Sequence, residues 1–391
     1  MRITDIRVLS TRLPASAAAM VQVDTDEGIV GVGATSAPAL AISALVQAGP
    51  ESIRSLLVGS DPTNTNSAWR KMFASGQRGR SGEGGVAVNA MAAVDMALWD
   101  IAGKVRGVPV HELLGGAVQD EVMAYASGTA FDLEALEITG DLRMKSIDAL
   151  VAESNENVAR GFKAIKFGWG NNFASQDIET LQAIREAIGS DIRLMLDFGC
   201  PAYLEGGWNV KDAIRVARLL EGVDLFFLEE PLHPYDVDGF ATLTAQSLVK
   251  IATGESLTTV REFQPFIERH AVDIIQPDAQ QIGITQLVRV ARRAEEAGIP
   301  CVPHGPWSAM TVAAHIAVLS TVSNGIMIEY PSYAVREGST DRELGEAMLD
   351  RVIQWPVVLT DGYLQLPDTP GLGLGDYDLE AIADLEVRYG E

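Results

Sequence analysis

The stretch from Gly161 to Pro331 decides the fold, because it repeats one pattern seven times. A short apolar run ends each time at an ionisable residue: AIK at 164–166, LMLD at 194–197, LFFLE at 225–229, IATGE at 251–255, IIQPD at 274–278, CVPH at 301–304 and IMIE at 326–329. Amphipathic helical segments lie between these runs. The interval of about 25–30 residues is typical of one strand plus one helix of a barrel whose eight units fill ~250 residues. Polar residues at the carboxyl ends of barrel strands meet at one mouth, where barrel enzymes place their active sites.

The composition is that of a globular protein with two domains. A chain of 391 residues exceeds one ordinary hydrophobic core. Its formal net charge of −23 argues against nucleic acid and anionic membranes as partners. No uninterrupted apolar run reaches the ~18 residues that span a bilayer, and the first residues lack a secretory signal, so we expect a cytoplasmic protein. The two cysteines, Cys200 and Cys301, provide neither a disulfide framework nor a thiolate metal site.

The first 118 residues do not follow the barrel rhythm and predict a separate α+β domain. Their pattern predicts strands over 2–9, 20–24 and 29–34 and helices over 39–46, 51–57, 65–73 and 86–105. Two loops, 13–20 and 76–85, are either flexible surface loops or lids over the barrel mouth. In the second case Arg78 and Arg80 are candidate substrate contacts.

The barrel is expected to begin near residues 122–125 and to close after Glu329. Residues beyond about 356 return to turn-rich sequence. Their glycine run, PGLGLG at 370–375, superficially resembles a dinucleotide-binding fingerprint. It has neither a preceding strand nor a following helix, so we reject that interpretation.

Three carboxylates end successive strands: Asp197 the third, Glu229 the fourth and Glu255 the fifth. Brought together at one mouth, they cannot all stay ionised without a compensating cation. Oxygen-only ligation favours a hard metal, above all Mg²⁺, which keeps positions open for water or substrate. Any one of them could instead cap a helix or pair with a basic residue, but a metal site explains all three.

Asp278 and His304 end the sixth and seventh strands. A carboxylate on a neighbouring strand end can hold one imidazole nitrogen and leave the other free to move protons. The remaining histidines, His315 on a predicted helix among them, show no such placement. Lys166 could bind an anionic substrate or act as a base. Glu329, if its pKa is raised, could donate a hydrogen bond to a substrate carboxylate. Both could also form a structural ion pair inside the barrel.

Motifs across nearly the whole chain are similar to those of the enolase superfamily, in its mandelate racemase and acid-sugar dehydratase branch. They are DMALWD at 95–100, GK at 103–104, LLGG at 113–116, GFKAIK at 161–166, EEP at 229–231, GE at 254–255, PDA at 277–279, PH at 303–304, IEY at 328–330 and PGLG at 370–373. The resemblance implies an α/β fold, a modified (β/α)₇β barrel over 119–355. An α+β capping domain, residues 1–118 completed by about 356–391, would cover it.

The same resemblance implies a cofactor, site roles and an assembly. One Mg²⁺ per subunit would bind Asp197, Glu229 and Glu255. Asp278 and His304 would form the acid–base dyad. A homo-oligomer is expected.

Two positions depart from the racemase pattern. Racemases of this branch carry a second lysine two residues after the first, as the base that faces the histidine, whereas Gly168 follows Lys166 here. Gly199, two residues past Asp197, stands where the racemase has an amide side chain. Proton transfer between two faces of a substrate needs an acid and a base on opposite sides. Losing one such group typically costs ~10²–10⁴-fold in rate, whereas dehydration needs one base only.

We therefore predict a lyase that dehydrates an acid sugar, an aldonate or aldarate, to a 2-keto-3-deoxy acid through an enediolate. His304 would remove the proton α to the substrate carboxylate, and Mg²⁺, Lys166 and Glu329 would stabilise the resulting charge. The alternatives are an epimerase, racemase or cycloisomerase of acid sugars or their lactones, or a non-catalytic regulatory relative. Further candidate substrate contacts are Trp169, Trp307, Arg78 and Arg80.

Overall fold

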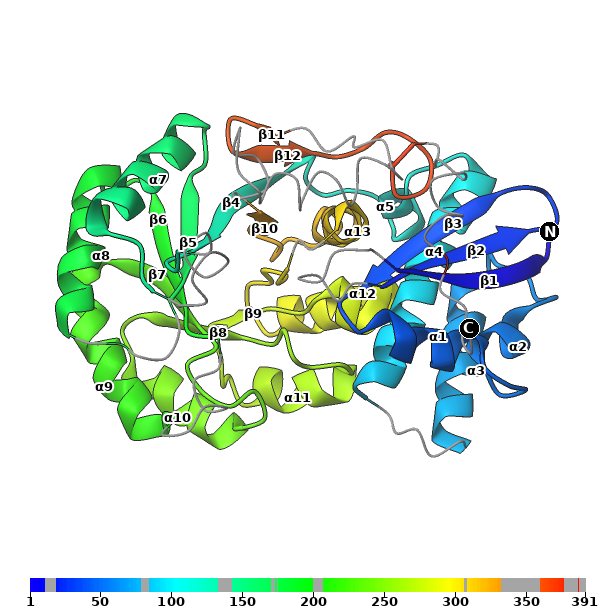
Figure 1. Ribbon diagram of the computed structural model, residues 1–391, viewed down its shortest axis with the longest axis horizontal. Coiled ribbons are helices and arrows are strands. Elements are labelled where there is room, and N and C mark those ends of the chain that lie inside the picture. Colours follow the sequence, from blue (N-terminus) through cyan, green and yellow to red (C-terminus); the bar gives the residue numbers. More distant parts are fainter. Residues whose placement is uncertain are drawn as a thin grey trace.

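The structure is a computed structural model that describes residues 1–10, 19–78, 84–132, 143–169, 173, 175–199, 207–305, 308–331, 359–375 and 386. A small α+β domain lies beside a barrel of parallel strands (Figure 1). The sheet of the small domain contains β1 (Ile3–Ser10), β2 (Ala19–Thr25) and β3 (Val30–Thr35), antiparallel and paired in that order. Its helices are α1 (Ala39–Gln47), α2 (Ile53–Leu57), α3 (Thr65–Arg78) and α4 (Val86–Arg106), close to the predicted bounds.

The barrel has eight strand positions, and each neighbouring pair is parallel. A short helix, α5 (Val110–Leu113), leads into it. The first six positions are β4 (Glu121–Thr129), β5 (Ala164–Gly168), β6 (Arg193–Asp197), β7 (Leu225–Glu229), β8 (Lys250–Thr253) and β9 (Ile274–Ile275). Cys301 forms the seventh through bridges to Ile275 and Gly325. The eighth, β10 (Ile328–Pro331), pairs with β4 and closes the barrel.

Helices alternate with these strands, which gives the predicted modified (β/α)₇β order. Two of these helices begin with a capping box, in which Asn209 and Thr259 are the N-cap residues. A polar residue just before an apolar helical pattern is typical of such a helix start. The helices are α7 (Ile147–Ala159), α8 (Ser175–Ile188), α9 (Val210–Leu220) with the 3₁₀ turn η2 (Glu221–Val223), α10 (Val237–Gln246), α11 (Val260–Glu268), α12 (Ala279–Glu296) and α13 (Ala309–Leu319).

Two stacked rings of side chains fill the barrel, because every second residue of a strand points inward. The lower one, which we call the apolar ring, is fully buried and contains Tyr125, Ala164, Met195, Phe227, Ala252, Ile274, Val302 and Met327. Two residues further along each strand position lies the polar ring: Ser127, Lys166, Asp197, Glu229, Gly254, Gln276, His304 and Glu329. Five of the seven predicted ionisable residues thus lie at one level at the mouth of the barrel, whereas Glu255 and Asp278 follow the ring positions Gly254 and Gln276.

Helix α4 joins the small domain to the barrel. On one side it packs closely on β3, where a Cβ on Gly33 would lie only 1.9 Å from the Ala93 carbonyl oxygen. Small residues on both surfaces, glycine on the strand and alanine on the helix, permit this approach. The helix is long and apolar enough to cross a membrane, but 94% of its most apolar 18-residue window is buried inside the protein. It is therefore a core helix.

Two buried aspartates of α4 bind other parts of the chain. Asp95 accepts hydrogen bonds from the backbone N–H and the hydroxyl of Thr285 on α12, at 2.8 and 2.6 Å. Thr285 follows the kink of α12 at Gly283, where φ is 71°. Asp100 accepts one from the backbone N–H of Leu372, at 2.9 Å. The DMALWD motif thus connects α4 to α12 and to the segment around Leu372. It contributes no group to the barrel mouth.

The segment after residue 358 contacts both domains. Strands β11 (Leu359–Thr360) and β12 (Tyr363–Gln365) pair with each other, and β12 pairs antiparallel with β4 of the barrel. Further on, Gly371 exchanges backbone hydrogen bonds with Val108 and Val110, next to the end of α4. The division at residues 118 and 356 stays a prediction.

Candidate active site

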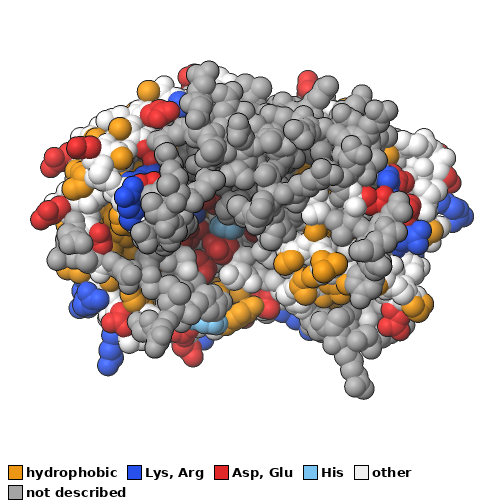
Figure 2. All heavy atoms as spheres, viewed as in Figure 1, with side chains coloured by type: hydrophobic (Ala, Val, Ile, Leu, Met, Phe, Trp, Pro, Cys, Tyr) orange, Lys and Arg blue, Asp and Glu red, His pale blue; other side chains and the backbone are white. Residues whose placement is uncertain are grey.

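Figure 2 shows acidic side chains and a histidine in a hollow near the middle of the molecule. The polar ring contains residues of these types. Three of its neighbouring carboxylates form a cluster: one oxygen each of Asp197, Glu229 and Glu255 lies within 4.8 Å of the others. Glu255 joins this cluster although it lies one residue beyond the ring position of its strand. The ring position before it is Gly254 (φ 139°), where a Cβ would lie 3.1 Å from the Gln276 nitrogen. Glycine therefore lets the strand bend so that Glu255 turns inward.

The carboxylate cluster has the properties of a divalent metal site. Burial is the main cause that raises the pKa of Glu229 well above its usual range and that of Glu255 to about 8, and neighbouring carboxylates add to it. One oxygen of Glu229, Oε1, is buried and has no hydrogen-bond partner among the described residues. Asp197 is held by the backbone N–H of Gly199, at 2.7 Å. Oxygen donors that resist ionisation unless a cation is present fit Mg²⁺ or a similar hard ion.

Lys166 is surrounded by carboxylates. Its ammonium nitrogen lies 2.7 Å from Glu229 Oε2, 3.0 Å from Glu329 Oε1 and 3.6 Å from Asp197 Oδ2, and its side chain is 2% exposed. Burial alone would lower the pKa of Lys166, but these carboxylates raise it well above its usual range. Lys166 is accordingly a fixed cation at the floor of the site.

His304 and Asp278 meet as the sequence predicts. The His304 Nδ1 lies 3.3 Å from Asp278 Oδ2, and its Nε2 points to the metal-site carboxylates, 3.4 Å from Glu255 Oε2. Burial disfavours the imidazolium, but Glu255 and Asp278 raise the pKa of His304 well above its usual range. Asp278 is also the N-cap of α12, with Oδ1 accepting from the Gln280 N–H at 2.8 Å. Burial alone would raise the pKa of Asp278, but the neighbouring His304 and His315 lower it below its usual range.

The sequence left two roles open for Glu329: a hydrogen-bond donor, if its pKa is raised, or a partner in an ion pair inside the barrel. The structure places it in an ion pair with Lys166. Burial does favour the neutral acid, but Lys166, His304 and two hydrogen bonds lower the pKa of Glu329 to about 2. Those bonds come from the Ser127 hydroxyl at 2.5 Å and the Gly305 N–H at 2.8 Å. Glu329 is therefore an acceptor that holds Lys166 and the loop after the seventh strand position.

Of the further predicted substrate contacts, Trp169 is the one whose side chain the structure describes. Trp169 is 3% exposed and belongs to the large apolar cluster around the barrel, which leaves little of its surface for a ligand. Arg80 and Trp307 lie outside the described residues, as does the side chain of Arg78.

Sequence reasoning missed three residues near the site. Ser127 and Gln276 occupy the polar ring, and the rule of alternate residues along the first and sixth strands could have identified both. Gln276 is fully buried, and both its amide atoms lack a hydrogen-bond partner among the described residues. His315 approaches Asp278 from α13, to 3.6 Å. No local pattern signals that contact, because it depends on how two helices pack.

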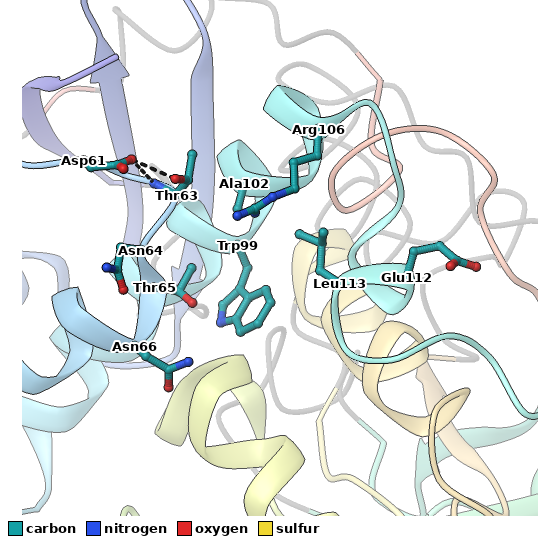
Figure 3. A pocket seen from close by; sticks show the side chains of 10 residues that line it. All are labelled: Asp61, Thr63, Asn64, Thr65, Asn66, Trp99, Ala102, Arg106, Glu112 and Leu113. Atoms are coloured by element: carbon teal, nitrogen blue, oxygen red, sulfur yellow. Dashed lines mark hydrogen bonds between the residues drawn. The ribbon is translucent and has the colours of Figure 1, made fainter.

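A second cavity, of about 600 Å³, lies in the small domain between the start of α3, the end of α4 and α5 (Figure 3). Trp99 and Arg106 from α4 and Asn66 from α3 line it. Trp99 already donates its indole N–H to Thr285, and Asn66 accepts from Arg289. Among the predicted site residues that the structure describes, none lines this cavity.

Comparisons with known proteins identify the family of the chain. Residues 6–115 match the N-terminal domain of the mandelate racemase and muconate lactonizing enzyme family, and residues 149–376 match its enolase C-terminal domain-like partner. The chain is 29% identical to a D-galactarolactone cycloisomerase of Agrobacterium fabrum, over 98% of this chain and 95% of that one. It is 31% identical to a D-galactonate dehydratase of Ralstonia pickettii, over 96% and 92%.

One similar solved structure contains magnesium. A racemase from Streptomyces coelicolor with bound magnesium superposes with a TM-score of 0.80 at 26% identity, over 98% of this chain and 100% of that one. The small domain therefore corresponds to the family's N-terminal domain and the barrel to its catalytic one. The chain belongs to the mandelate racemase and muconate lactonizing enzyme family of the enolase superfamily.

Proposed function

We propose that the protein is a Mg²⁺-dependent dehydratase that converts an aldonate or aldarate to a 2-keto-3-deoxy acid. One observation carries the proposal: the His304–Asp278 dyad faces the carboxylate cluster, while Gly168 leaves the opposite strand position without a base. A site with one base suits elimination better than proton transfer between two faces. Relatives named as dehydratases of galactonate, arabinonate and gluconate support this class of substrate.

Asp197, Glu229 and Glu255 would hold the metal, one ion per subunit. A bound Mg²⁺ supplies Lewis-acid polarisation of the substrate carboxylate, which acidifies the α-proton. The ion would also take up the negative charge that the buried carboxylates cannot otherwise keep ionised. Lys166 adds a second positive charge on the same side, fixed by Glu329.

His304 would carry the proton through both stages. Its Nε2 takes the proton α to the carboxylate, while Asp278 holds Nδ1 and stabilises the imidazolium. The electron pair moves into the carboxylate to give an enediolate, next to Lys166. The electrons then return, the β-carbon–oxygen bond breaks, and His304 gives its proton to the departing hydroxide. The resulting enol tautomerises to the 2-keto acid.

The test is a screen of Mg²⁺-loaded protein against mono- and diacid sugars, with semicarbazide detection of 2-keto-3-deoxy products. We expect one stereochemical series to react and His304→Asn to lose at least about 10²-fold in rate. A His304→Asn variant with nearly full activity on the best substrate would contradict the proposed role of the dyad.

A cycloisomerase or epimerase of acid sugars or their lactones is the second candidate. The Agrobacterium relative named for lactone cycloisomerisation favours it, since the match covers nearly all of both chains. Exchange of the α-proton in heavy water without formation of a 2-keto product would identify this second activity.

A further inference from the structure

We propose that His315 is a positioning residue of the acid–base dyad: it binds the backbone N–H of Ala279 and so keeps the Asp278 carboxylate on His304. The inference rests on the proposed function for its catalytic consequence. It concerns a residue of α13, outside both rings of the barrel.

The contacts of His315 define its tautomer. The side chain is fully buried, and its Nε2 accepts a hydrogen bond from the Ala279 N–H at 3.0 Å. The same nitrogen lies 3.6 Å from Asp278 Oδ1, which is too long for a hydrogen bond. A nitrogen that accepts cannot carry the proton, so neutral His315 is protonated on Nδ1. That Nδ1 has no partner among the described residues, so the ring's polar link is the one to Ala279.

This hydrogen bond completes the N-terminus of α12. The first N–H groups of a helix need acceptors from outside its own ladder. Asp278 Oδ1 serves Gln280 at 2.8 Å, and the Asp278 carbonyl serves Gln281 and Ile282 at 3.0 Å each. Ala279 carries the first N–H of α12. Its acceptor is Nε2 of His315, which lies on another helix, α13.

Without that acceptor, the Ala279 N–H would compete for Asp278. A buried donor seeks a partner, and hydrogen bonds to an ionised carboxylate are stronger than those to neutral groups. The carboxylate would turn toward its own helix and away from His304 Nδ1, which it now meets at 3.3 Å. His304 would then lose the partner that fixes its ring for proton transfer.

Two variants separate positioning from packing. In His315→Gln, the Oε1 is the same number of bonds from the backbone as the imidazole Nε2 and can accept from Ala279. His315→Leu fills the space but accepts nothing. For the best acid sugar, we expect His315→Leu to lower kcat and the α-proton exchange rate ~10–100-fold at nearly constant KM. His315→Gln should restore most of the rate.

The matched control is Ser320→Ala, which removes a buried hydroxyl from the end of the same helix without touching the dyad. It should keep the wild-type rate. Full activity in His315→Leu, or equal losses in the Leu and Gln variants, would overturn the proposal.

A measurement without turnover keeps this test independent of the proposed function. In Mg²⁺-loaded protein labelled with ¹⁵N-histidine, the five histidines of the chain can be assigned by single substitutions. We expect His315 to show an unprotonated Nε2 and a protonated Nδ1. The opposite tautomer, or a doubly protonated ring, would overturn the inference. If no acid sugar reacts with the wild type, the proposed function fails, and this measurement still decides the role of His315.

Discussion

In the proposed reaction, Gly168 leaves one face of the substrate without a base. It lies two residues beyond Lys166 on β5, and a Cβ built there would meet its nearest neighbours, Gly128 O and Thr129 Oγ1, at 3.7 and 3.9 Å. These are ordinary contact distances, so the position can accept a side chain. The absence of a base on this face is therefore a property of the residue type rather than of crowding.

Substituting Gly168→Lys should add that second base. We expect deuterium from heavy water to enter the α-carbon of acid sugars of both configurations, at least about tenfold faster than in the wild type. NMR of the recovered substrate measures this exchange. Gly168→Met is the matched control, because it has similar length and no basic nitrogen. Equal exchange in the two variants would show that the opposite face is not accessible from β5.

Lys166 should stabilise the metal-free protein. Lys166→Met leaves the ionised Glu329 buried without its cation, and breaking such a pair costs about 3–5 kcal/mol. Denaturant unfolding without and with Mg²⁺ measures the loss, which the ion should partly offset. Arg54→Met, which breaks an exposed pair with Asp5, should cost less than about 1 kcal/mol. A similar loss in both variants would contradict the charge argument.

The ionisable ring residues were predictable because strand ends and alternation are local properties. The ionisation state of Glu329 was not, since it depends on Lys166, Ser127 and the Gly305 N–H meeting in space. The same reason hid His315, whose partner lies on a different helix.

The contact between α4 and α12 through Asp95 should make the stability of the protein depend on pH. Burial raises the pKa of Asp95 to about 7, despite the two hydrogen bonds from Thr285. Between pH 4 and 7 the unfolded chain releases this proton and the folded chain retains it. Stability should therefore fall as pH rises through this window, by up to about 1.4 kcal/mol per pH unit from this group.

Unfolding at several pH values measures that slope. Asp95→Asn should flatten it, because an amide does not titrate. Asp148→Asn, an exposed substitution in the first turn of α7, should leave it unchanged. An unaltered slope in Asp95→Asn would show that Asp95 is ionised in the folded protein throughout.

The elements themselves were largely predictable, with two informative exceptions. Strand β9 is two residues long, and the seventh position consists of bridges at Cys301. Both apolar runs are short, and each is followed within two residues by a proline, Pro277 or Pro303. Proline lacks the N–H group that a strand donates to its neighbour in the sheet. The spacing of the sequence placed both runs in the barrel as its sixth and seventh strands, but how few of their residues pair is seen only in the complete fold.

The whole molecule should gain stability from the metal. An ion that binds only the folded state raises the unfolding free energy by RT ln(1 + [L]/Kd), about 2.7 kcal/mol at a hundred times Kd. We expect Mg²⁺ to raise the thermal midpoint of the wild type and not that of Glu229→Gln. Lys250→Gln, outside the cluster at the start of β8, is the control and should respond as the wild type does. A midpoint that ignores Mg²⁺ at any concentration would contradict the metal site.

The hydrogen bond between Asp100 and Leu372 also has a consequence for how the protein is made. The two partners are 272 residues apart, so a ribosome completes nearly the whole barrel between them. Throughout that time the first domain carries a buried carboxylate whose backbone partner does not yet exist. Long-range closures of this kind are slow and leave apolar surface open to association. Release of the nascent chain, rather than synthesis of the first domain, should therefore be the moment at which that domain reaches its final form.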